Sequence, residues 1–473
     1  MKYKLISIVI IIALVFLGLF LDSYYDKELS YVYHQHIEDS SDEFLCDGIS
    51  NCSHLPIVNI NTNNQAIPGE DKDKSKYIIS DINIYDNGND VNTLGVDGYS
   101  IKARLRYRGR SSLYFDKKGY LIRFVDDDNK KISEEFLGMP ADNQWVLHGP
   151  FIDKTLIRNY MWYNISQEIM GAAPKTRLLE LYVDNEYMGV YLAAESVTQS
   201  SSSRVKISSI NKDSIATSYL IQLDAELGNE ITSLNSFSNY TFKLRYNIES
   251  ELGYVIKYPE DEDISEDVKK YIYDDFNEFE KMLYSFDYKE YKDYIDVDSF
   301  VDYFIINEFT QNYDAGYLST YIYKDVFGKY KMYVWDFNSA NNNYETDFLE
   351  QQFFEFQNNV WFEPLIRDEE FVEAVISRYE ELRNSYLSEE YLYNYIDGTV
   401  SYLGDAIDRN FEVWGYTFEP DYDAFVTSYM PIDYEDAIAQ LKDAIHKRGE
   451  WMDKNIYTLR QYCHPSKTKK YNK

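Results

Sequence analysis

The segment that most constrains the fold is a run of aromatic and β-branched residues with an aspartate at each end. Tyr317–Tyr323 (YLSTYIY) is followed by the turn residues Asp325–Gly328 and then by Tyr330–Val334 (YKMYV). This pattern predicts an antiparallel β-hairpin. In such a hairpin, the residue before the first strand lies close to the residue after the second. We therefore expect Asp314 and Asp336, which are 22 positions apart (336 minus 314), to meet at one end of the hairpin.

Two carboxylates placed in this way admit two interpretations. Aspartates beside hairpins are commonly turn or capping residues. In protein kinases, however, an aspartate before a hairpin takes the proton of the acceptor hydroxyl, and an aspartate after it holds Mg²⁺ on the phosphates. The strand periodicity alone favours the first interpretation, so the choice depends on the sequence around the pair.

Several further sequence blocks accompany the hairpin. From the N-terminus they are Leu55–Ile60, Arg106–Ser112 (RYRGRSS) with Lys117 and Lys118 after it, Leu156–Asn159, Glu180–Tyr191 running on to Glu195, Ile256–Pro259, and Arg448 with Trp451. Together with Asp314 and Trp335–Phe337, these blocks resemble the CotH kinase family, the secreted kinases similar to spore coat protein H. The resemblance extends from about Leu55 to Ile456. It implies an atypical protein-kinase-like fold with two lobes, and ATP and Mg²⁺ as cofactors.

The secondary-structure pattern agrees with this implication. Strand-like alternation dominates the first half of the chain, and helical spacing of apolar residues dominates the second. Helices are predicted over 153–170, 268–286, 297–310, 371–387, 390–411 and 434–456. The predicted fold class is α+β, with a β-rich N-terminal lobe, a helical C-terminal lobe and one membrane helix before them. We expect a signal anchor over residues 1–22, an extracellular stem over 23–54, the β-rich lobe over 55–224, the helical lobe over 225–456 and a basic tail over 457–473.

The N-terminal segment has the pattern of a signal anchor. Leu5–Leu21 contains 17 consecutive uncharged residues, with basic residues before it and Asp22 after it. This order of charges predicts an N-in, C-out orientation. No small-residue cleavage site follows the run. We therefore expect a single-pass protein whose folded part lies on the extracellular face; secretion after cleavage is the alternative.

Charge and cysteine content restrict the partners. The chain has 80 acidic and 47 basic residues, and its formal net charge is -33. Since a phosphate backbone requires Lys and Arg surfaces, nucleic acid is excluded as a partner. The expected partners are the membrane and an exported protein substrate, such as a coat or cell-surface protein. Outside the cell, Cys46 and Cys52 are free to form a disulfide, and neither has the spacing of a zinc motif.

The resemblance implies roles for individual residues. Asp314 corresponds to the catalytic base or hydroxyl-orienting group, and Asp336 to a Mg²⁺ ligand, since a hard carboxylate suits a hard ion. The turn expected to cover the phosphates consists of Arg108, Gly109, Arg110, Ser111 and Ser112. Glycine permits close approach, while the hydroxyls, backbone N–H groups and guanidiniums offer donors to phosphate oxygens. Without the downstream aspartates, the same turn is interpreted as an ordinary hairpin with exposed arginines.

Two further positions leave alternatives open. The phosphate-contacting lysine is Lys118 or its neighbour Lys117; strand alternation puts only one of them on the cleft face, and we favour Lys118. Glu195 ends a strand where the family also has a glutamate. It either lines the nucleotide site or is a surface acid.

Two residues depart from the family pattern. Ser319 replaces an asparagine at the start of the strand after the catalytic loop, and Asn338 replaces the second aspartate of a Trp-Asp-x-Asp motif. Both positions are expected metal ligands. Serine binds Mg²⁺ more weakly than an amide oxygen, and Asn338 removes one charge. A second metal site is therefore weakened.

Three classes of function compete. The first is a kinase acting on exported proteins, and the second is a catalytically inactive relative that serves as a binding or structural component of a coat or surface. The third, a hydrolase, lacks support because the chain contains no G-x-S-x-G, H-E-x-x-H or G-x-x-x-x-G-K-[ST] motif. Paired carboxylates would also serve a glycosidase, but the Arg-Gly-x-Ser-Ser block then has no role.

Overall fold

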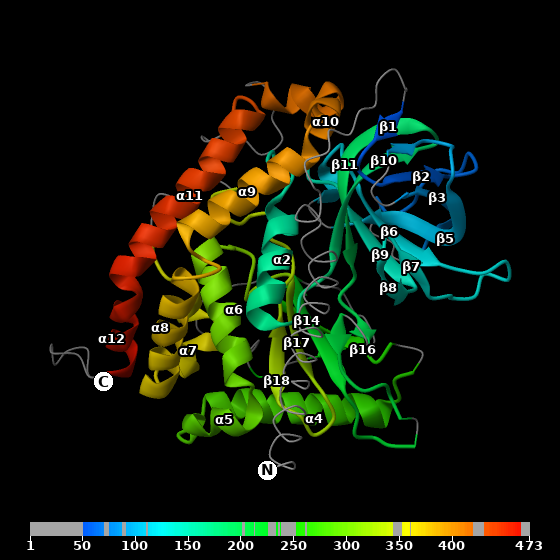
Figure 1. Ribbon diagram of the computed structural model, residues 1–473. Helices are drawn as coiled ribbons and strands as arrows, with labels where there is room; N and C mark the ends of the chain where they lie inside the picture. The colour runs from blue at the N-terminus through cyan, green and yellow to red at the C-terminus, as the bar shows by residue number, and fades with distance from the viewer. Residues whose placement is uncertain are drawn as a thin grey trace, which may run out of the picture.

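The computed structural model describes residues 51–70, 75–87, 91–109, 112–200, 204–211, 213–225, 233–234, 237, 252–260, 263–343, 352–359, 361–419 and 430–464. Figure 1 shows a β-barrel on one side, a second sheet below it and a layer of helices on the other side.

Strands from the first half of the described chain close into a barrel. In spatial order they are β10 (Thr176–Val183), β11 (Glu186–Glu195), β9 (Gln144–His148), β6 (Gly119–Phe124), β5 (Tyr99–Arg108), β3 (Ile78–Tyr85) and β2 (Ile57–Asn61). The parallel pairing of β2 with β10 closes the barrel. Alternate residues fill the interior of a small barrel; Tyr120, Ile122 and Phe124 do so on β6. Leu121 lies between them in sequence and packs instead into the core shared with the helices.

The second sheet carries the predicted hairpin. Its strands in spatial order are β15 (Ser233–Leu234), β16 (Leu252–Tyr258), β14 (Tyr219–Ala225), β17 (Thr320–Lys324) and β18 (Tyr330–Tyr333). Strands β17 and β18 are antiparallel, with Tyr321 opposite Tyr333, which confirms the predicted hairpin. All but the last residue of β14 falls within residues 55–224, which the sequence assigns to the first lobe. It nevertheless pairs with β17 and belongs to the second sheet.

Helices and short strand pairs complete the fold. The helices are α2 (Arg158–Met170), α4 (Glu266–Leu283), α5 (Tyr291–Tyr294), α6 (Val297–Thr310), α7 (Phe362–Leu365), α8 (Glu369–Arg383), α9 (Glu389–Leu403), α10 (Ala406–Trp414), α11 (Tyr434–Asn455) and α12 (Arg460–Cys463). The short pairs are β1 (Cys52–Ser53) with β4 (Asn92–Thr93), β7 (Glu134–Phe136) with β8 (Met139–Asp142), and β12 (Gln199–Ser200) with β13 (Val205–Lys206). The predicted α+β class, with a β-rich first half and a helical second half, is confirmed.

Helix α2 lies between the barrel and α6 (Figure 1) and begins later than the sequence indicated. The apolar spacing predicted a start at Asp153, whereas the helix begins at Arg158. Leu156 has a φ of 66° and is therefore not helical. The Asp153 carboxylate accepts hydrogen bonds from the backbone N–H groups of Thr155 (3.1 Å) and Arg158 (2.9 Å). Asp153 thus organises the turn before the helix instead of the helix start itself.

Helix α10 fixes the barrel against the helical half. Its Asn410 Oδ1 accepts hydrogen bonds from Lys117 Nζ (2.7 Å) and from the Val190 backbone N–H (3.1 Å). Trp414 Nε1 donates to the Met188 carbonyl at 2.9 Å. These bonds connect α10 to β11 and to the residue two positions before β6.

The predicted chain ends lie largely outside the described residues. This applies to the signal anchor at 1–22 and to all but the last four residues of the stem at 23–54. No helix within the described ranges is both long enough and apolar enough to cross a membrane. Cys52 is disulfide-bonded and Cys463 is free, while Cys46 lies outside the described residues. The predicted basic tail starts inside helical structure, where Arg460 pairs with Glu373 at 2.5 Å.

Candidate active site

The loop after α6 carries Asp314. Helix α6 ends at Gln311, which has a φ of 47°. Asn312 then folds back, donating from its backbone N–H to the Asn307 carbonyl (3.1 Å) and from Nδ2 to Asn307 Oδ1 (3.2 Å). The Asp314 carbonyl accepts from the Leu318 N–H at 2.7 Å. Asp314 therefore lies in a tight turn between α6 and β17.

Asp336 follows β18, and hydrogen bonds hold both its backbone N–H and its carbonyl. Its φ is 63°, a left-handed conformation that non-glycine residues adopt only when the surroundings stabilise it. The Asp336 N–H donates to the Tyr163 hydroxyl, and its carbonyl accepts from Asn312 Nδ2; both distances are 3.0 Å. Asn312 belongs to the loop of Asp314, so the hairpin does bring the two aspartates to one end, as predicted.

The electrostatics of Asp314 show a third carboxylate in the site. Burial, and after it the charges of Asp336 and Asp224, raise the pKa of Asp314 to about 7, while a hydrogen bond with Ser339 acts in the opposite direction. Asp224 lies on β14, one residue beyond Leu223, which pairs with Thr320. Asp224 was missed in the sequence because it is a single acid at the end of an apolar strand, with no motif spacing.

Helix α2 holds the segment that follows Asp336. Asn159 Oδ1 accepts from the Phe337 N–H at 2.7 Å, and Asn159 Nδ2 donates to Asn338 Oδ1 at 3.1 Å. Arg158 Nε donates to the Ala340 carbonyl at 2.9 Å. These contacts give the Leu156–Asn159 block a structural role: from α2 it positions residues 337–340, the segment that contains the expected metal ligand Asn338 and follows the other, Asp336.

His148, at the end of β9, is another residue that the sequence did not single out. Burial lowers its pKa, the charges of Asp336 and Asp153 oppose this change, and Arg108 adds to it. The imidazole is therefore neutral at pH 7 and lies within electrostatic reach of Asp336. A lone histidine at a strand end carries no sequence signal of this position.

The phosphate-covering turn is partly described. The Arg108 guanidinium lies over the Trp335 ring, 5.0 Å from its centroid. Gly109 has a φ of 133°, and a Cβ there would lie 1.8 Å from Ser112 Oγ, so this position requires glycine. Ser112 begins the short 3₁₀ helix Ser112–Tyr114. Arg110 and Ser111 lie outside the described residues.

The two lysines after the turn point to different partners. Lys118 Nζ donates to the Leu113 carbonyl (2.7 Å) and pairs with Glu70 (3.7 Å). Lys117 is 1% exposed and donates to Asn410 Oδ1 on α10. Lys117 is thus the lysine that faces the helical half, and the role of Lys118 as a phosphate contact stays a prediction.

Glu195 ends β11 and is buried, with 0% of its surface exposed, which excludes the surface-acid interpretation. Its Oε2 accepts from the Lys175 N–H at 3.0 Å. In register it is opposite Trp145, three residues along β9 from His148, or about 10 Å. Its place at the nucleotide site stays a prediction.

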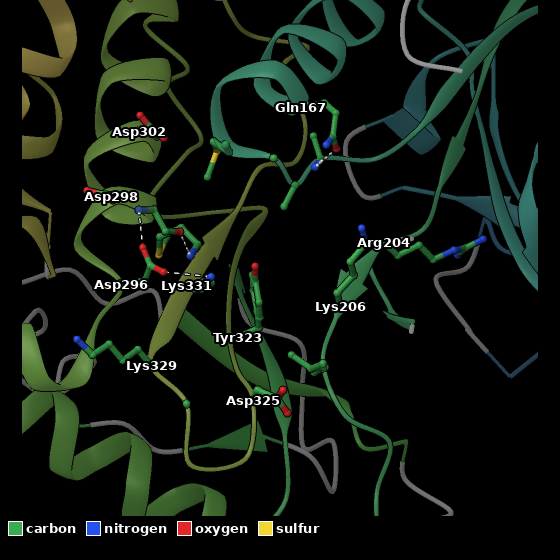
Figure 2. A pocket seen from close by; sticks show the side chains of 18 of the residues that line it. Gln167, Arg204, Lys206, Asp296, Asp298, Asp302, Tyr323, Asp325, Lys329 and Lys331 are labelled. Atoms are coloured by element: carbon green, nitrogen blue, oxygen red, sulfur yellow. Dashed lines mark hydrogen bonds and ion pairs between the residues drawn. The ribbon is translucent and has the colours of Figure 1, made fainter. Parts of the chain in front are cut away.

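A cavity of about 530 Å³ lies at the far end of the hairpin (Figure 2). Lys206, on β13, lines one side of it, and Asp296 and Asp298, at the start of α6, line the other. Lys331 pairs with Asp296 at 3.1 Å. The hairpin turn also lines this cavity, whereas Asp314 and Asp336 do not. It is therefore separate from the candidate active site.

The donor set fits Mg²⁺ better than a metal enclosed by protein alone. No group of three or more His, Cys, Asp or Glu side chains is arranged to hold a metal ion, as far as the described ranges extend. Mg²⁺ commonly uses one or two carboxylates, with water and substrate phosphates completing its shell. Asp336 and Asp314 provide such carboxylates. Ser319, with a φ of 48°, lies between Asp314 and β17, and the Asn338 amide is already bonded to Asn159.

Comparison with known sequences agrees with this geometry. The family model for CotH kinase protein matches residues 105–452, which include the turn at Arg108 and both Asp314 and Asp336. No curated protein matches the chain.

Proposed function

This chain belongs to the CotH kinase family, and we propose that it transfers the γ-phosphoryl group of ATP, with Mg²⁺, to hydroxyl side chains of an exported protein. One observation carries the proposal. Asp314 and Asp336 are joined at one end of the hairpin through Asn312, and the Arg108 guanidinium lies over the neighbouring Trp335 ring. Phosphoryl transfer requires this combination of an acceptor-orienting carboxylate, a metal-binding carboxylate and a cation.

The residues have distinct roles in this proposal. Asp314, whose pKa of about 7 suits proton transfer at neutral pH, orients and deprotonates the acceptor hydroxyl. Asp336 holds Mg²⁺, which neutralises charge on the phosphates when bound. Arg108 donates to phosphate oxygens from a side chain that has no ion pair among the described residues. Tyr163 and Asn159 position Asp336 and the residues after it.

The location of the activity is part of the proposal. The apolar run Leu5–Leu21 and the charges on its two sides support a single-pass anchor, with the catalytic lobes on the extracellular face. The acceptor is then an exported protein, such as a component of a spore coat or cell surface.

A second function is favoured by the departures from the family pattern. Ser319 replaces an amide, and Asn338 replaces a carboxylate and is engaged by Asn159. A family member without a second metal site would serve as a binding or structural component of the coat or surface. The two functions differ in whether nucleotide binds.

A thermal-shift titration of the full chain with ATP, with and without Mg²⁺, separates them. A ligand that binds only the folded state stabilises it by about 2.7 kcal/mol at a hundredfold excess over Kd. We expect a Mg²⁺-dependent rise in the wild type that is lost in Asp336→Ala. The exposed loop variant Asp213→Ala is the control and should keep the rise. No rise in the wild type would favour the non-catalytic function.

A further inference from the structure

An unusual group of cations extends outward from the candidate active site. We call it the arginine ladder, and it consists of Arg104, Arg106 and Arg108 on β5 with Arg123 on β6. The alternation of β5 buries Ala103 and Leu105 in the barrel interior, so the arginines project from the outer face. Arg104 and Arg123 are directly opposite each other in the antiparallel pair.

The ladder has no counter-charge of its own. None of its four guanidiniums forms an ion pair with the described part of the chain. The charge of Glu260 acts on Arg123, but Glu260 is paired with Lys131. Like charges opposite one another on a sheet destabilise it. In a chain of net charge -33, four neighbouring arginines that form no ion pair with the described residues indicate a site for an external anion.

Most of the hydrogen-bond donors of the ladder have no acceptor among the residues that the structure describes. A guanidinium has five N–H donors. Arg106 donates once, to the Tyr107 carbonyl (3.1 Å), and Arg123 donates once, to Gln144 Oε1 (2.6 Å). Arg104 donates twice, both times to Asn129. Charge and donors are therefore both available to a ligand.

The pKa of Arg106 reflects the repulsion between the arginines of the ladder. Burial, and after it the charges of Arg123 and Arg108, lower this pKa to about 10. No carboxylate contributes in the opposite direction. An anion placed along the ladder would relieve this repulsion.

The spacing of the ladder matches an extended peptide. Side chains on one face of a β-strand recur about every 6.6 Å, so Arg104 is about 13 Å along β5 from Arg108. The ladder begins at Arg108, over Trp335 and beside Asp336, and continues two steps away from them. An extended peptide presents alternate side chains with the same repeat. Acidic side chains at alternate positions would therefore meet successive arginines.

We propose that the arginine ladder binds an acidic, extended segment of the acceptor protein and leads its hydroxyl residue to Asp314. This substrate class rests on the kinase function proposed above and deepens it. The formal net charge of the chain is -33, so an acidic segment needs a local group of cations such as the ladder to bind. The arginines are only partly buried, so salt screens their attraction for an acidic peptide and the affinity falls as ionic strength rises.

The chain itself contains a suitable probe sequence. Residues 38–43 read Glu-Asp-Ser-Ser-Asp-Glu. In an extended chain each face of this segment carries two acids four residues apart with a serine between them, and their separation of about 13 Å matches that of Arg104 and Arg108. The probe is a fluorescein-labelled peptide of residues 34–45, and its control is the same peptide with the acids replaced by their amides. Fluorescence anisotropy with the full chain measures binding, and transfer from labelled ATP to the peptide measures phosphorylation.

The test compares the double variant Arg104→Gln/Arg123→Gln with the wild type. We expect at least a tenfold loss of affinity for the acidic peptide, no loss in the control Lys130→Gln and rescue of affinity by Arg104→Lys/Arg123→Lys. The Mg²⁺-ATP thermal shift should be retained in every variant and shows that each one is folded. Equal binding of the acidic peptide by wild type and double variant would overturn the proposal.

Other outcomes distinguish this inference from the proposed function. If the double variant loses the ATP shift while its affinity for the peptide is unchanged, the ladder is a nucleotide site and the inference is wrong. If acidic and amide peptides are phosphorylated equally well, the kinase function holds and the ladder proposal fails. If the wild type binds the acidic peptide through the ladder but never phosphorylates it, the ladder proposal holds and the kinase function fails.

Discussion

The side-chain amide of Asn312 donates a 3.0 Å hydrogen bond to the backbone carbonyl of Asp336. It connects the loop of Asp314 directly to the segment after β18. Since the Asp336 N–H is bound to Tyr163, both sides of its backbone are fixed in a left-handed conformation. The position of Asp336 therefore depends on the side chains of Asn312 and Tyr163.

Removing the Asn312 amide should weaken metal binding without unfolding the protein. Residues that orient a metal ligand typically affect metal affinity or activity by about 10- to 100-fold. We expect Asn312→Ala to need a correspondingly higher Mg²⁺ concentration for half of the ATP-dependent thermal shift. Asn384→Ala, at the exposed end of α8, is the control. Superimposable Mg²⁺ titrations for Asn312→Ala and wild type would contradict this role.

Asp314 should make stability depend on pH in a defined direction. Its folded pKa of about 7 lies above its ordinary value of 3.8, so the folded state holds the proton more tightly than the unfolded state. The free energy of unfolding therefore falls as pH rises from about 4 to about 7, and the loss is complete above that range. The variant Asp314→Asn has no titrating carboxyl group at this position, so it does not undergo this fall in the free energy of unfolding. Without Mg²⁺, its thermal midpoint relative to wild type should be higher at pH 8 than at pH 4; a constant difference argues against the raised pKa.

The ion pair between Arg448 and Glu308 should be essential for the helical half. Arg448 Nη2 lies 3.0 Å from Glu308 Oε2, and the side chains are 1% and 0% exposed. Removing one member of a buried pair costs about 3–5 kcal/mol because the other charge stays buried. We expect Arg448→Met to lose about this much in denaturant-induced unfolding. The double variant Glu308→Gln/Arg448→Met should recover much of the loss, and its failure to do so would point to packing instead of charge.

Gly109→Ala should distort the phosphate-covering turn. The new Cβ would lie 1.8 Å from Ser112 Oγ, at a φ of 133° that alanine rarely adopts. We expect a reduced ATP-dependent thermal shift, with a loss of global stability of about 1–3 kcal/mol from strain. Gly415→Ala is the matched control, since no atom lies within 4 Å of a Cβ at that position. An unchanged ATP titration for Gly109→Ala would separate this turn from nucleotide binding.

Local pattern was sufficient for the hairpin and for the meeting of its two aspartates. The alternation of β17 and β18 and the turn residues between them set the register, and the register alone brings both chain ends to one side. Local pattern was less reliable at the start of α2. There Asp153 binds the Arg158 N–H and Leu156 takes a positive φ, so the apolar spacing extends beyond the true helix.

Pattern also could not assign β14 to its sheet. Its apolar sequence fits a strand of either lobe, and only its pairing with β17 places Asp224 beside Asp314. The choice between Lys117 and Lys118 also depended on the tertiary structure. Strand alternation puts the two side chains on opposite faces, but only the position of α10 shows that Lys117 faces the helical half.

The sequence by itself determined the family, the α+β class, the hairpin and the aspartate pair, because these depend on residues near one another in the chain. Only the tertiary structure decided what surrounds the pair. Asn159 reaches Asn338 across 179 positions, and His148 and Asp224 approach from two different sheets. No sequence periodicity links such distant residues, since their proximity results from the packing of the barrel, α2 and the second sheet against one another.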